Sequence, residues 1–270
     1  MTRPFFPLAD DYVSRGLIAA AMFSFAGLFV TAPALLFDDR LINGASVWHK
    51  PLKFWLSLGV QFATFAVLAQ LLTPANRDRI ALKAVCFVAL VALAFENVYI
   101  TLQAARGRAS HFNYETSFEA TMYALMGLGA LTFVLLGIVI GAMLAFQRDG
   151  DRSGLKLGAI LGLIVGSLLT FAYGGYMSIY GSHYFAMPGA SDAGGLPVVG
   201  WATRATDMRP AHFMATHMVQ ATPVVGWLLD RFAPAAARIG VWLAAVALAA
   251  LTTLLFVLPL TGVAPLGWLG

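Results

Sequence analysis

Two histidines stand in the first turns of an apolar segment, RPAHFMATHMVQATPVVGWLLD, which covers residues 209–230. Neutral imidazole binds transition metals and haem iron, and it also transfers protons near neutral pH. His212 and His217 are five residues apart, which corresponds to about 140° around a helix. They therefore do not form the i, i+4 pair that holds one metal on a single helical face. If both histidines bind a metal or haem iron, either the helix must bend between them or they must belong to two separate metal centres.

Glu96 is the only carboxylate well inside a predicted membrane span. An acid in hydrocarbon is costly, so it is a functional-site candidate that should face the bundle interior. The helical rise puts Glu96 about 12 Å from the helix end at Ala104, and His217 about 10 Å from Pro210. This similar depth permits a cavity shared by Glu96 and His217. The alternative is that Glu96 and Asn97 bond to one another or to a neighbouring helix and only specify packing.

A third histidine, His111 in ASHFNYET, is followed by Glu115 and Glu119 at intervals of four residues. If a helix begins near His111, all three side chains lie in one stripe and supply nitrogen and oxygen ligands. The alternative is a solvated helix entrance, where acids are stabilised by the helix dipole. The predicted metal ligands are His111, His212, His217 and Glu115, and the predicted catalytic groups are Glu96 and His217.

Four arginines lie near the predicted helix ends on the same side as these histidines. Guanidinium groups bind carboxylates and phosphates, so they can hold an anionic substrate or haem propionates. The predicted cofactor-binding residues are Arg106, Arg108, Arg204 and Arg209. His49 and His183 are weaker ligand candidates, because a histidine at the membrane interface can simply face water.

The composition places these residues in a membrane protein. The chain has 270 residues, of which 60% are hydrophobic and 11% charged, whereas a soluble domain has about 25% charged residues. The net charge of +4 is distributed between apolar runs, which indicates topology signals and lipid contacts rather than nucleic-acid binding. The single cysteine, Cys86, excludes an intrachain disulfide.

An all-α bundle of seven transmembrane helices is predicted, because a span needs about 20 mostly apolar residues. The whole chain forms one transmembrane domain. The predicted spans are residues 16–37, 51–72, 80–104, 118–146, 155–180, 211–229 and 239–260. The last span contains no lysine, which excludes a retinal Schiff base. The short motifs of seven-helix zinc hydrolases are also missing.

The orientation follows from the distribution of lysine and arginine. Ten of these residues, beginning with Arg3, lie in the N-terminal segment and the second, fourth and sixth loops, and seven lie on the other side. This bias predicts a cytoplasmic N-terminus and a periplasmic C-terminus in a bacterial-type inner membrane. All five histidines then lie at the periplasmic face, where the loops are longer and richer in aromatic residues.

The fifth predicted span has glycine at every fourth position, at Gly154, Gly158, Gly162 and Gly166. A helix face without side chains lets another backbone approach closely. This pattern predicts tight helix packing, either within the chain or between two copies in a homo-oligomer.

The resulting functional hypothesis is a membrane oxidoreductase with a periplasm-facing site that binds a transition metal or haem. Its substrate would be a small or lipid-soluble molecule taken from the bilayer. Two alternatives stay open. One is a proton-coupled transporter that uses Glu96 and His217 as a relay, and the other is a lipid-binding or assembly factor in which Lys50, Lys53 and the arginines bind phosphate groups.

Overall fold

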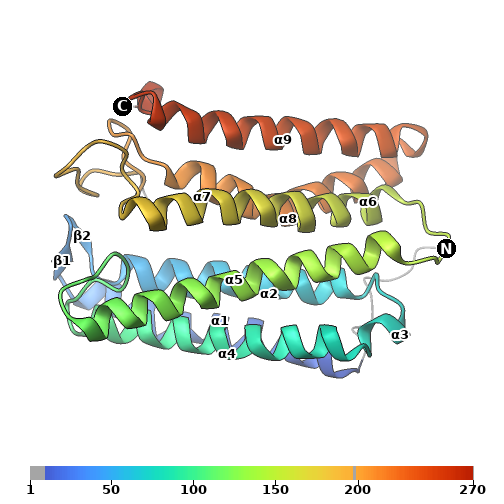
Figure 1. Cartoon of the computed structure of the whole chain (residues 1–270), viewed down its shortest axis with the longest axis horizontal. Coiled ribbons are helices and arrows are strands. Elements are labelled where there is room, and N and C mark those ends of the chain that lie inside the picture. Colours follow the sequence, from blue (N-terminus) through green and yellow to red (C-terminus); the bar gives the residue numbers. More distant parts are fainter. Residues whose placement is uncertain (1–9, 197–198, 270) are drawn as a thin grey trace.

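A computed structural model of the chain describes residues 10–196 and 199–269, and Arg3 lies outside them. Long helices run side by side along a bundle, and the start of α1 and the C-terminal residues lie at opposite ends of it (Figure 1). The helices are α1 (Tyr12–Phe37), α2 (His49–Ala69), α3 (Pro74–Arg77), α4 (Ile80–Ala105), α5 (Ser117–Phe146), α6 (Gly154–Leu161), α7 (Ser167–Tyr180), α8 (Arg209–Phe232) and α9 (Ala237–Leu260). A π-helical turn, η1 (Gly162–Gly166), joins α6 and α7 into one run.

Short 3-10 turns and one hairpin complete the secondary structure. The turns are η2 (Pro234–Ala236) and η3 (Gly267–Leu269), and the antiparallel strands are β1 (Leu41–Ile42) and β2 (Ala45–Ser46). Asn43 and Gly44 of the hairpin turn have positive φ angles of 52° and 79°, and asparagine and glycine are the residues that tolerate them best.

Six helical runs are long and apolar enough to cross a membrane: α1, α2, α4, α5, the run α6–η1–α7, and the run formed by η2 and α9. Each predicted span corresponds to one long helix or helical run. However, α8 is not among the six, because histidine, glutamine and charged side chains lower its mean hydropathy. The chain is therefore a multi-pass helical protein suited to a bilayer, with six of the seven predicted spans supported by apolarity.

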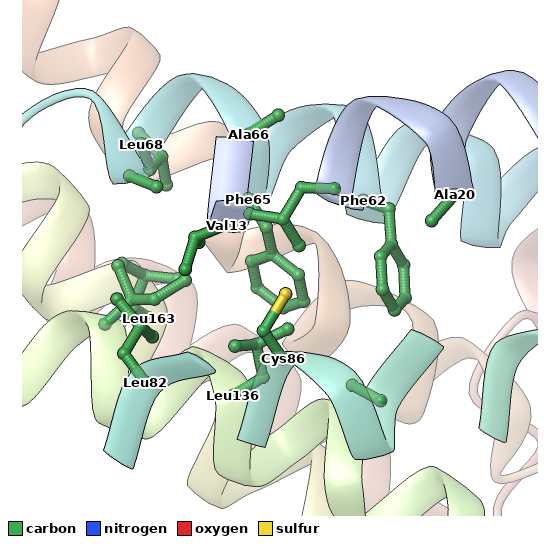
Figure 2. Packing of buried hydrophobic residues seen from close by; sticks show 14 of the residues in the cluster. Val13, Ala20, Phe62, Phe65, Ala66, Leu68, Leu82, Cys86, Leu136 and Leu163 are labelled. Carbon is green, nitrogen blue, oxygen red and sulfur yellow. The ribbon is translucent and has the colours of Figure 1, made fainter. Parts of the chain in front are cut away.

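The bundle consists of two halves. Helices α1, α2, α4 and α5 pack together in one half, and α6, α7, α8 and α9 pack together in the other (Figure 1). The halves meet closely where α5 contacts the α6–η1–α7 run. The main core lies in the first half and includes Val13, Phe62, Phe65 and Leu136, with Leu163 of η1 reaching into it (Figure 2).

The four glycines of the fifth span pack against α8. A side chain at Gly158 would overlap the backbone of Thr222, and one at Gly226 of α8 would overlap the backbone of Gly154. The Thr222 hydroxyl donates a hydrogen bond to the Gly158 carbonyl at 2.7 Å. The glycine face is thus filled within the chain, so a homo-oligomer through this face would have to displace α8.

Most of the candidate functional side chains lie at or near one end of the bundle. This end, called the loop end below, contains residues 38–48, 106–116, 181–196, 199–208 and 261–269 (Figure 1). His49, His111 and His183 lie there, and α8 begins there. Within residues 10–269, the described connections at the opposite end are short, at residues 70–79, 147–153 and 233–236.

Candidate functional site

A network centred on Arg209 ties the 181–208 loop to the start of α8. The Arg209 guanidinium contacts Asp207 at 2.7 Å and Asp192 at 2.7 Å. The hydroxyl of Tyr184 donates to Asp192 at 2.7 Å and accepts a hydrogen bond from Arg209 at 3.0 Å. Asp207 is fully buried, so its charge depends on this pairing. Arg209 therefore holds the loop in place and is already neutralised by two carboxylates.

Two lysines in the first turn of α2 lie near this network but outside its ion pairs. The ammonium group of Lys53 donates a hydrogen bond to the Val199 carbonyl at 3.0 Å. Lys50 makes no hydrogen bond or ion pair with the described residues, although it is close enough to Asp192 and Arg209 to interact electrostatically. The N-terminus of α2 also has no side-chain cap. The first turn of α2 thus carries two lysines that form no ion pair with the described residues, although Asp192 lies close enough to attract both.

His111 lies beside this turn in an aromatic environment. Its ring is 5.4 Å from the ring of Phe54 on α2 and 5.7 Å from that of Tyr123 on α5. Burial, reinforced by the nearby charge of Lys50, lowers the pKa of His111 well below its usual value. His111 is therefore neutral at physiological pH and adds no positive charge to the region.

His183 belongs to the Arg209 network rather than to the surroundings of His111. Its Nε2 lies 3.5 Å from Asp192, and its ring is 4.3 Å from the ring of Tyr184. Phe112 lies between the two regions, with its ring 5.5 Å from Tyr123 and 6.1 Å from His183. The loop end thus combines an ion-paired network, two lysines and a set of aromatic rings.

His217 lies deeper, where α8 faces α2. Its Nδ1 is 3.2 Å from Oε1 of Gln220. The amide nitrogen of Gln220 in turn donates to Gln61 at 3.0 Å and to Thr64 at 3.3 Å, both on α2. These four residues, His217, Gln220, Gln61 and Thr64, are called the α2–α8 polar group below. A glutamine in the middle of SLGVQFATF was the sequence signal for Gln61.

His212 points in another direction, toward α7. Its ring occupies the space that a side chain at Gly174 would fill, with the imidazole Cε1 only 2.9 Å from that position. His212 Nδ1 is enclosed and has no hydrogen-bond partner within the described residues. His212 and His217 therefore face different helices, as their spacing predicted.

Glu96 is enclosed between α4 and α5, away from His217. It is 2% exposed, and its Oε1 lies 2.7 Å from the position of a Cβ at Gly129. Neither carboxyl oxygen has a hydrogen-bond partner within the described residues, and Asn97 bonds to Ser24 on α1 instead. The predicted shared cavity is not formed by direct contact, because Glu96 and His217 lie against different helices.

Replacing Glu96 by methionine should raise stability by about 1–3 kcal/mol, because an unpartnered buried polar group is exchanged for an apolar one of similar length. Thermal unfolding in detergent measures the change. Glu115→Met, at a side chain that is 69% exposed, is the matched control and should change stability by less than about 0.5 kcal/mol. A less stable Glu96→Met protein would mean that the carboxyl group has a stabilising partner.

The stripe of His111, Glu115 and Glu119, which required a helix that begins near His111, is not formed, because α5 begins at Ser117. Glu115 lies in the preceding loop and pairs with Arg108 at 2.5 Å. Glu119 stands in the first turn of α5, where the Thr116 hydroxyl bonds to its carboxylate. The N-cap residue Thr116 determines where α5 begins, so the four-residue spacing of His111, Glu115 and Glu119 does not correspond to a helix.

The other predicted arginines are divided between ion pairs and solvent. Arg108 contacts Glu119 at 3.1 Å, and Arg106 lies 4.0 Å from the same carboxylate. Arg204 is exposed and lines an open hollow of about 610 Å³, together with residues such as Met187, Leu196 and Leu269. Arg106, Arg108 and Arg209 thus lie close to carboxylates, whereas Arg204, like the two lysines of α2, has no carboxylate partner in the described chain.

No three histidine, cysteine, aspartate or glutamate side chains in the described part of the chain are grouped so that they could hold a metal ion. His111, His212, His217 and Glu115 have different neighbours. Metal or haem binding stays a prediction from the sequence. Comparisons of the chain with protein-family models, with curated proteins and with solved structures give no match.

Proposed function

We propose that the protein binds the anionic head group of a membrane-resident amphipathic molecule at the loop end, against the first turn of α2. The observation that carries this proposal is the pair Lys50 and Lys53, two cations one helical turn apart without an ion pair in the described chain. This proposal corresponds to the lipid-binding alternative from the sequence.

The local charge balance favours an anion. Asp192 and Asp207 both contact Arg209, so the carboxylates are committed to the guanidinium. Lys50 is repelled by Lys53, and both lysines are repelled by Arg209, whereas Asp192 attracts both; an anion between the lysines relieves the remaining repulsion. The uncapped backbone N–H groups at the N-terminus of α2 add partial positive charge at the same place.

The surroundings favour an amphipathic ligand over a free ion. The lysines stand at the end of an apolar helix, where lysine places its charge at the membrane interface and its methylene groups along apolar surface. Phe54, His111 and Tyr123 supply aromatic surface next to them. A phosphate or carboxylate at the interface, attached to an apolar tail in the bilayer, satisfies both kinds of contact.

The test compares lipid-induced stabilisation of the purified protein in a neutral detergent. Short-chain phosphatidylglycerol should raise the melting temperature of the wild type more than phosphatidylcholine does. Lys50→Ala with Lys53→Ala should abolish most of this difference, because the excess positive charge is gone. Inorganic phosphate in a parallel titration shows whether the head group alone is sufficient.

The matched control is Lys83→Ala. Lys83 lies at the other end of the bundle and pairs with Asp78 at 2.5 Å. This variant should keep the full response to phosphatidylglycerol. An equal response in the wild type and the double lysine variant would contradict the proposal.

A further inference from the structure

The α2–α8 polar group lies near the middle of the helices that carry it. Gln61 is twelve residues after His49, the first residue of α2, which is about 18 Å along the helix, and His217 is about 12 Å from the start of α8 by the same rise. Polar groups at such depth are costly unless they are bonded or serve a ligand. Figure 1 shows α2 and α8 on the same side of the bundle, behind α5 and α7.

The hydrogen bonds within the group fix what it offers to a ligand. Gln220 uses its amide nitrogen for Gln61 and Thr64, so its Oε1 faces His217. Nδ1 of His217 must then carry the proton and donate it, which leaves Nε2 as an acceptor. Thr64 donates its own hydroxyl to the Val60 carbonyl at 2.8 Å.

Two positions in the group stay unused. Nε2 of His217 has no hydrogen-bond partner within the described residues, and neither has the amide nitrogen of Gln61. Neither nitrogen is completely enclosed by the described protein atoms, and both side chains are partly exposed. One acceptor and one donor are therefore available within the α2–α8 polar group, a pair that matches a hydroxyl group, which can donate to histidine and accept from an amide.

Aromatic side chains extend the group toward the loop end. The ring of Phe213 lies 4.1 Å from that of His217, and the ring of Trp201 lies 5.1 Å from that of Phe213. Phe213 is 38% exposed. Aromatic rings favour stacked and edge-to-face contacts with another ring, so a flat aromatic ligand gains from this surface.

We propose that the α2–α8 polar group is a binding site for a membrane-soluble phenol, whose hydroxyl donates to Nε2 of His217 and accepts from Gln61 while its ring packs on Phe213. The site uses neither Lys50 nor Lys53. A negative result for one of the two sites therefore does not contradict the proposal for the other.

The experiment uses two redox-inert probes, 2,3,5-trimethylphenol and its methyl ether, titrated by calorimetry into the full-length protein in detergent with a micelle blank. The two probes have the same ring, but the ether has no hydroxyl proton to donate. We expect the wild type to bind the phenol at least tenfold more tightly than the ether. His217→Phe keeps an aromatic ring but removes the acceptor, so the ratio of the two affinities should fall close to one.

The matched control is His49→Phe, at a histidine outside the polar group, and it should keep the wild-type ratio. Gln61→Leu should lower the affinity for the phenol, because the amide donor is lost. Equal binding of phenol and ether by the wild type, or no binding of either, would overturn the proposal without any variant. An unchanged ratio in His217→Phe would overturn the assignment of the acceptor.

Discussion

Replacing Arg209 by alanine should lower the stability of the protein by about 3 kcal/mol or more, because loss of one partner from a buried ion pair leaves an uncompensated charge. Asp207 is fully buried and contacts Arg209 twice, at 2.9 and 2.7 Å. Asp192 loses the same partner, and with it one of the bonds that hold the loop between α7 and α8. Thermal or chemical unfolding in detergent measures the loss.

The control for this variant is Arg15→Ala. The Arg15–Asp10 pair is exposed, with 69% and 77% of the two side chains accessible, and exposed pairs contribute little to stability. Arg15→Ala should therefore be close to wild type. If both arginine variants were equally stable, the network around Arg209 would have no structural role.

The pH dependence gives a second measurement of the same network. Burial acts to raise the pKa of Asp192, but the bonds from His183 and Tyr184 and the charge of Arg209 together hold it well below its usual value near 3.8. A depressed pKa contributes stability above the unfolded value and loses it as the pH falls further. The wild type should thus lose stability in acid below about pH 4.

The Arg209→Ala protein should lose less stability in acid than the wild type. The charge of Arg209 is one of the causes that lower the pKa of Asp192, so without it this pKa lies closer to its unfolded value, while the bonds from His183 and Tyr184 remain. A smaller pKa difference between the folded and unfolded states gives a shallower dependence of stability on pH. Parallel acid curves for the two proteins would contradict this explanation.

Replacing Gly158 by leucine should lower stability by about 3 kcal/mol or more, or prevent folding, because a side chain at this position overlaps the backbone of Thr222. The neighbouring atoms are main chain and cannot move aside as the end of a flexible side chain can. The α6–α8 contact should therefore open, and unfolding should begin in the second half of the bundle. Melting temperature and yield of monodisperse protein measure the effect.

Gly127→Leu is the matched control, since a side chain at Gly127 on α5 meets no atom within 4 Å. The same chemical change should have little effect there. Comparable losses in the two variants would indicate a general intolerance of leucine rather than tight packing of α6 on α8.

The length and apolarity of the sequence segments are sufficient to predict the helices. Runs of apolar residues about as long as a bilayer is thick are helical for a general reason: in hydrocarbon, backbone N–H and C=O groups must bond within the segment. The glycine spacing also predicted close packing, and the spacing of His212 and His217 predicted that they face different ways. The exception is α8, whose polar residues reduce the apolar signal although the helix runs along the bundle (Figure 1).

Which polar groups have partners depends on how the helices and loops pack together. Arg209 and Lys50 are both cations near helix starts, but Asp192 and Asp207 pair with Arg209 and leave Lys50 without an ion pair in the described chain. Glu96 and His217 have similar predicted depths, yet rotation about their helix axes turns them toward different neighbours, Gly129 and Gln220. The depth of a side chain in the bundle follows from counting residues along one helix. The distance between two side chains on different helices depends on how those helices rotate and pack. That packing is set by contacts between residues far apart in the chain.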